Sequence, residues 1–121
     1  MKVARAPHFV RRREAPKVAG QGHLPFRPHV REDFRETCAY CLLEEIWAAG
    51  AENFEVDHFR PQSLFPQLRA SYYNLYWSCH VCNRLKRGQW PSRTMRESGI
   101  DFVDLCEDSF EKHFAVRRNG Q

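Results

Sequence analysis

The chain has 121 residues, of which 42% are hydrophobic and 28% are charged, and its formal net charge is +4. This composition predicts one soluble globular domain with a modest core, small enough for a metal site to contribute to its stability. No apolar run approaches the roughly 20 residues of a membrane helix, which excludes a membrane-spanning protein.

Positive charge is concentrated at the N-terminus. Residues 1–31 contain eight basic residues and one acidic residue, a balance of +7, so the remaining residues carry −3. Residues 1–30 also contain four prolines and two glycines, which disfavour a long helix. We therefore predict a flexible basic arm over residues 1–30 that meets nucleic acid, followed by a folded domain over residues 31–121. A solvated tail with no partner is the alternative.

The first elements of the folded domain are short. Val30 and Phe34 lie at helical spacing, which predicts a helical turn over residues 31–37. A second short helix is expected over residues 42–49, with Leu43, Ile46 and Trp47 on one side and a glycine directly after it.

The next elements predict a hairpin followed by a helix. Residues 54–59 alternate as a strand does, which places Asp57 and His58 on opposite faces. Residues 62–71 are polar and predict a surface loop. The aromatic run that follows is expected to supply Tyr73, Leu75 and Trp77 to the core. A helix then runs from the second cysteine pair to Lys86.

Four of the five cysteines form two Cys-x-x-Cys pairs, namely Cys38 with Cys41 and Cys79 with Cys82. The N-terminus lacks the apolar stretch of a secretory signal, so we expect a cytoplasmic protein, whose thiols stay reduced. Two such pairs suit tetrahedral zinc, whereas a thioredoxin-like redox site would need one pair in a βαβ unit. We predict a structural Zn²⁺ held by all four thiolates. Cys106 is expected to be a small buried hydrophobic residue.

Three polar residues lie close to the predicted zinc site. Asn83 follows Cys82 directly, so the zinc anchor would place it opposite Asp57 on the hairpin. Two such oxygen ligands suit Mg²⁺ or Mn²⁺, and His58 beside them would activate a water molecule. The other histidines have no such neighbours and are expected to be structural or exposed: His8, His23, His29, His80 and His113.

These motifs resemble the HNH endonuclease family, of the zinc-bearing His-Me finger type. The resemblance covers residues 31–90 and is closest to bacterial proteins with an Asp-His-Phe-Arg-Pro stretch, some of them associated with anti-phage defence. It implies an α+β fold in which a ββα-metal finger over about residues 36–90 is stapled by the four-cysteine zinc site. Residues 91–121 would cover this finger. The motifs that carry the resemblance are Cys38-Ala-Tyr-Cys41, Glu55-Val-Asp57-His58-Phe-Arg-Pro61, Asn74-Leu75 and Cys79-x-x-Cys82-Asn83-x-x-Lys86.

The resemblance also implies roles for single residues. His58 would be the general base, and Asp57 and Asn83 would hold the catalytic Mg²⁺ or Mn²⁺. Asn74 would brace the loop and orient the base. Nucleic acid would be contacted by Arg60, Arg84, Lys86 and Arg87, unless these side chains only form a solvated face.

The function so implied is metal-dependent hydrolysis of phosphodiester bonds in double-stranded DNA, in a phage-defence or mobile-element context. A zinc module that binds nucleic acid without cutting it is one alternative, although such a module would need only the cysteines. An HNH nuclease acting on RNA is the other. A site-specific enzyme of this size would normally need a protein partner or a homodimer.

The C-terminal segment is less informative. Apolar residues over 100–105 and 110–116 are expected to cover the finger. Asn119-Gly120 is a hairpin-turn signal, yet only one residue follows it, so we expect a chain shortened relative to a longer domain.

Overall fold

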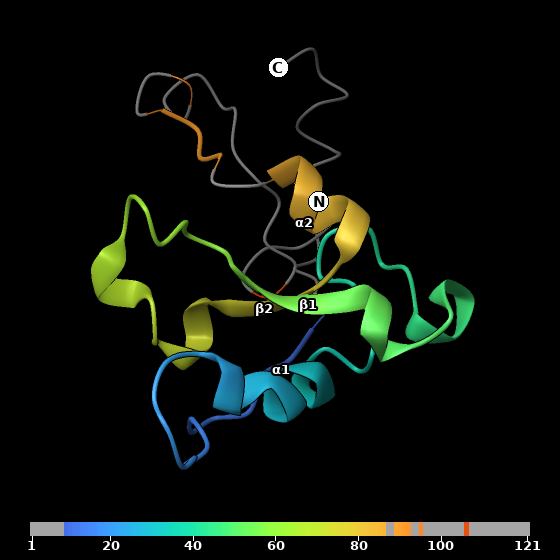
Figure 1. Cartoon of the computed structure of the whole chain (residues 1–121), viewed down its shortest axis with the longest axis horizontal. Helices are drawn as coiled ribbons and strands as arrows, with labels where there is room; N and C mark the ends of the chain where they lie inside the picture. The colour runs from blue at the N-terminus through green and yellow to red at the C-terminus, as the bar shows by residue number, and fades with distance from the viewer. Residues whose placement is uncertain (1–8, 87–88, 93–94, 96–105, 107–121) are drawn as a thin grey trace, which may run out of the picture.

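The computed structural model describes residues 9–86, 89–92, 95 and 106, and its centre is an antiparallel hairpin (Figure 1). Strand β1 (Phe54–His58) pairs with strand β2 (Leu75–Cys79). Helix α1 (Arg27–Asp33) and helix α2 (His80–Lys86) both contact the two strands. Figure 1 shows α1 and α2 on opposite sides of the hairpin. This small α+β arrangement, with α2 directly after β2, confirms the predicted fold class.

The hairpin has apolar residues on both faces, so it lies inside the protein. All five residues of β2 are buried. The Phe54 ring stacks on Trp77 on one face, and the Phe59 ring stacks on Tyr76 on the other. Alternate residues of β1 therefore point to opposite faces, as the sequence pattern predicted.

Helix α1 begins and ends earlier than the helical turn predicted over residues 31–37. Proline is found in its first turn, where the fixed φ of proline favours a helix start. Val30 and Phe34 are fully buried, as their spacing suggested. Arg35 and Glu36 have φ values of 55° and 59°, in the left-handed region, so the chain leaves the helix before Thr37.

The helix predicted over residues 42–49 is wrong in extent and orientation. Only a short 3-10 turn forms, Glu45–Ala48, and Ile46 and Trp47 are each 77% exposed. Glu45 is instead the inward residue, at 4% exposed, because Arg31 and the Trp77 indole both donate hydrogen bonds to its carboxylate. A buried charge with these partners sets the direction of the turn.

Residues 9–12 and 23–30 contact the folded domain, although they lie in the segment for which the sequence predicted a flexible arm. Phe9 is only 2% exposed, and the guanidinium groups of Arg11 and Arg12 both pair with the buried Asp33. Tyr73 is 42% exposed, which corrects its predicted place in the core, and its hydroxyl donates to the backbone oxygen of Arg12.

The remaining described elements are short turns. Four further 3-10 turns connect the main elements: Leu24–Phe26, Ala51–Asn53, Pro66–Leu68 and Tyr72–Asn74. Cys106 is half-buried and packs against the core. The covering segments predicted over 100–105 and 110–116, and the Asn119-Gly120 turn, lie outside the described residues.

Candidate active site and zinc cluster

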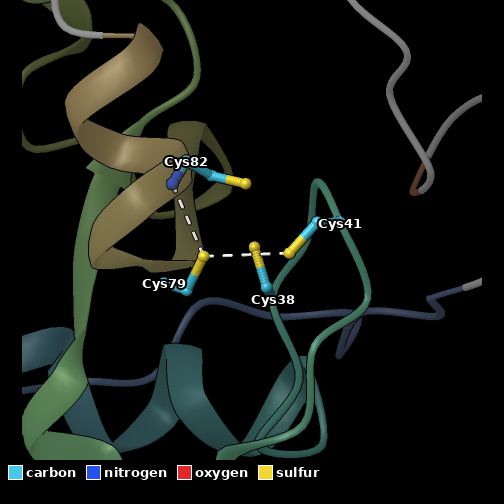
Figure 2. Close-up of side chains that lie close together, drawn as sticks. All are labelled: Cys38, Cys41, Cys79 and Cys82. Carbon is cyan, nitrogen blue, oxygen red and sulfur yellow. Dashed lines mark hydrogen bonds between the residues drawn. The ribbon is translucent and has the colours of Figure 1, made fainter. Parts of the chain in front are cut away.

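The four paired cysteines come together at one point, as predicted (Figure 2). Cys38 and Cys41 lie in the loop after α1, Cys79 ends β2, and Cys82 lies in α2. Their sulfur atoms are all within 4.8 Å of one another, and the Cys41 and Cys79 Sγ atoms are 3.7 Å apart. A tetrahedron with Zn–S bonds of about 2.3 Å has edges of about 3.8 Å. The cluster therefore fits a zinc ion.

The thiols of the cluster differ in how readily they ionise. Burial, which opposes charge, raises the pKa of the Cys41 thiol to about 11 and that of Cys82 still further. Burial acts the same way on Cys38, but backbone N–H groups, among them that of Tyr40 at 3.4 Å, lower the pKa of this thiol overall. Four thiolates at this separation repel one another, so a bound divalent cation would compensate the charge.

Asp57 is held by two side chains that sequence reasoning did not connect with it. The Tyr40 hydroxyl donates to Asp57 Oδ2 at 2.5 Å, and Lys86 Nζ lies 3.2 Å from the same oxygen. Burial and then the carboxylate raise the pKa of Tyr40 well above its ordinary value, so its hydroxyl remains a donor. Within the described residues both contacts of this carboxylate fall on Oδ2, which leaves Oδ1 for a ligand.

His58 is buried at the end of β1 and has a defined hydrogen bond. Its Nε2 lies 2.9 Å from the backbone oxygen of Arg69. A carbonyl oxygen only accepts, so Nε2 carries the proton and Nδ1 keeps the lone pair. The backbone therefore selects the tautomer of His58 in which Nδ1 is the basic atom.

Asn74 joins the two ends of the loop between the strands. Its Oδ1 accepts from the Arg60 backbone N–H at 2.9 Å, and its Nδ2 donates to the backbone oxygens of Arg60 and Leu68. The Asn74 backbone oxygen also accepts from the Phe59 N–H. These bonds fix the loop that follows His58, so Asn74 lies behind the site rather than in it.

One pocket brings together three of the predicted residues. It has a volume of about 370 Å³, and its walls include Asp57, His58 and Asn83, with Gln62 and Ser63 from the loop. His23 also lines this pocket, and its ring centroid is 4.6 Å from that of His58. Sequence reasoning treated His23 as structural or exposed, because nothing in its neighbourhood along the chain connects it with His58.

The predicted phosphate-contacting residues differ in their placement. Arg84 is exposed on α2, and Arg60 is half-exposed, with its guanidinium over the rings of Phe65 and Trp90. Lys86 is instead 7% exposed and donates to the His58 backbone oxygen at 2.7 Å, in addition to its contact with Asp57. Lys86 is therefore buried, whereas the sequence predicted that it contacts phosphate. Arg87 lies outside the described residues.

No helix among the described residues is long and apolar enough to cross a membrane. The chain has no match among curated proteins or solved structures. A family model described as HNH endonuclease matches residues 38–89, a range that contains both cysteine pairs, the hairpin and α2. This match agrees with the resemblance carried by the motifs, so residues 38–89 of the chain are similar to an HNH endonuclease domain.

Proposed function

We propose that this protein is a metal-dependent endonuclease that hydrolyses phosphodiester bonds in DNA. The HNH domain supports a nuclease-type function on nucleic acid in general. The observation that carries the finer proposal is the pocket that Asp57, His58 and Asn83 share, next to a hairpin and helix joined by the cysteine cluster.

His58 is the general base of the proposed reaction. Its Nδ1 accepts a proton from a water molecule as the water oxygen attacks the phosphorus atom. The bond from phosphorus to the leaving oxygen breaks, and the leaving oxygen takes up a proton from solvent. The hydrogen bond from Nε2 to the Arg69 carbonyl keeps the basic nitrogen defined during this step.

Asp57 and Asn83 are the proposed ligands of a catalytic Mg²⁺ or Mn²⁺. Their side chains offer carboxylate and amide oxygens, which these ions accept together with water and phosphate. Such an ion, when bound, neutralises charge on the scissile phosphate and the leaving oxygen. Tyr40 and Lys86 hold Oδ2 of Asp57 and thereby orient the carboxylate.

The other residues of the proposal hold the loop after His58 in place or contact phosphate. Asn74 holds the loop after His58 through its bonds to Arg60 and Leu68. Arg60 and Arg84 are the proposed phosphate contacts among the described residues. A single active site cleaves one strand at a time. A double-strand break therefore requires a homodimer, a protein partner or a second cleavage. We place this activity in the cytoplasm, in phage defence or on a mobile element.

The test is cleavage of supercoiled plasmid by the zinc-loaded protein with Mg²⁺, Mn²⁺ or EDTA. We expect metal-dependent nicking that falls by about 10²–10⁴-fold in His58→Ala, the usual contribution of a general base. His80→Ala is the matched control, because His80 lies on α2 near Glu55 and does not line the pocket. It should cleave as the unmodified protein does.

Three results would contradict different parts of this proposal and can be distinguished from one another. Salt-sensitive DNA binding without cleavage would support the non-catalytic zinc module instead. Cleavage of a matched RNA with the DNA left intact would keep the chemistry and change the substrate. Full activity in His58→Ala would remove His58 from the reaction.

A further inference from the structure

The turn before α1 reaches the active-site pocket from outside the HNH domain. His23 lies in this turn, upstream of the matched residues 38–89, yet it lines the pocket with His58. The two imidazole rings meet edge to face, with centroids 4.6 Å apart and planes at 74°. This is the favourable geometry for a pair of aromatic rings.

Backbone conformation brings the turn to this position. Gly20 and Gly22 have φ values of 102° and 77°, in the left-handed region that favours glycine. A Cβ on Gly20 would also lie 3.2 Å from Pro25, closer than ordinary contact. The two glycines thus allow the chain to bend sharply just before His23.

Contacts on the other side of His23 fix the turn to the hairpin. The Arg27 guanidinium donates to the backbone oxygens of Ala51 and Phe54, at the start of β1, and lies over the Trp77 ring. The Phe26 ring packs against Tyr72, with centroids 5.2 Å apart. His23 is therefore held against His58 by a folded support and does not rest there as a loose side chain.

Within the described residues the His58 ring makes one hydrogen bond, from Nε2 to the Arg69 backbone oxygen, which directs Nε2 but leaves the plane of the ring to be fixed by packing. We propose that His23 is a positioning residue for His58, whose ring fixes the imidazole plane of the base through edge-to-face packing. This proposal rests on the proposed function of His58. Burial, and then the neighbouring His58, lower the pKa of His23, which keeps its ring neutral beside the base.

The test compares His23→Ala with His23→Phe in the full, zinc-loaded chain. Alanine removes the ring, whereas phenylalanine keeps an aromatic edge without the nitrogen atoms. Misplacement of a catalytic group by about 1 Å lowers rates by up to about 10²-fold. We expect kcat for plasmid cleavage to fall by about 10–100-fold in His23→Ala, with KM within about twofold, and to recover largely in His23→Phe.

His29→Ala is the matched control. His29 is a half-buried histidine of α1 that contacts Arg12 and does not line the pocket. Zinc content and Tm should match the unmodified protein in both His23 variants. Unchanged kcat in His23→Ala would overturn the proposal. Equal loss in His23→Phe would also overturn it, because a nitrogen atom of His23 would then be required.

A spectroscopic readout separates this proposal from the proposed function. Nitrogen-15 NMR of the His58 ring reports its tautomer without any cleavage. We expect protonated Nε2 in the unmodified protein. In His23→Ala the imidazole plane is free to turn away from the Arg69 carbonyl, so we expect that hydrogen bond to be lost and the tautomers to mix, with recovery in His23→Phe. If the protein does not cleave DNA yet His58 shows this change, the positioning holds and the proposed function fails. An unchanged tautomer together with unchanged kcat contradicts the positioning alone.

Discussion

At the scale of single residues, the orientation of Asp57 depends on a tyrosine between two cysteines. Tyr40 occupies one of the two positions between Cys38 and Cys41, and its hydroxyl reaches Asp57 Oδ2. The cysteine cluster and the proposed catalytic carboxylate are therefore joined by one side chain. Lys86 contacts the same oxygen from α2, so the carboxylate is fixed from two elements.

We predict that Tyr40→Phe weakens both the fold and the site. The hydroxyl is buried and bonded to a carboxylate, so its loss should lower the free energy of unfolding by about 1.5–3 kcal/mol, measured by urea denaturation. Cleavage should also need a higher Mn²⁺ concentration. Tyr73→Phe is the control, since Tyr73 is an exposed residue whose hydroxyl, among the described residues, donates to a backbone oxygen and to no carboxylate. Equal metal dependence in Tyr40→Phe and the unmodified protein would contradict this view of Asp57.

At the scale of elements, the cysteine cluster joins the loop after α1 to the end of β2 and the start of α2. Both β2 and α2 are short, with five and seven residues, and isolated elements of that length are not stable in water. A zinc ion at this junction would therefore hold α2, which carries Asn83, to β2, the pairing partner of the strand that carries Asp57 and His58.

Zinc retention should depend on pH in a defined direction. Thiols must lose their protons to bind zinc, and burial raises the pKa of the Cys41 thiol to about 11, so protons compete increasingly as the pH falls. We expect zinc release and loss of the hairpin signal on acidification, measured with a colorimetric chelator and circular dichroism. Cys106→Ser should leave the release curve unchanged, because Cys106 is not in the cluster. A curve that does not move with pH would argue against thiolate ligation.

At the scale of the whole molecule, the basic N-terminal segment stabilises the fold in addition to any contact that it makes with nucleic acid. The Arg12 guanidinium pairs with Asp33 at 2.7 Å and with Glu32 at 2.8 Å, and Arg11 lies over the rings of Phe34 and Tyr72. Tyr72 donates from its hydroxyl to the same Asp33 carboxylate. Part of the positive charge is thus neutralised inside the protein.

The neighbouring arginines Arg12 and Arg13 offer a matched test. Arg12→Ala removes a guanidinium that pairs with two carboxylates, one of them buried, whereas Arg13 is exposed. Because Arg11 still pairs with Asp33, we expect Arg12→Ala to lower the free energy of unfolding by about 2 kcal/mol. Arg13→Ala should change it by less than about 0.5 kcal/mol. Urea denaturation measures both, and equal values would show that the segment is not part of the fold.

Features that depend on short spacing could be predicted from the sequence alone. These are the two cysteine pairs, the alternation of β1, the helix from the second pair to Lys86, and the neighbours Asp57 and His58. Each follows from turn geometry or from strand and helix periodicity, which act over a few residues. The HNH resemblance rested on the same local motifs.

Features that depend on contacts between distant segments were decided only by the tertiary structure. Periodicity placed Ile46 and Trp47 together on one side of a helix, but Arg31 and Trp77 bind the Glu45 carboxylate, so Glu45 points inward instead. His23 meets His58 because Arg27, at the start of α1, is bonded to the backbone at and just before the start of β1. Local sequence determines which side chains have the right chemistry, whereas long-range packing and the hydrogen bonding of buried charges determine which of them meet.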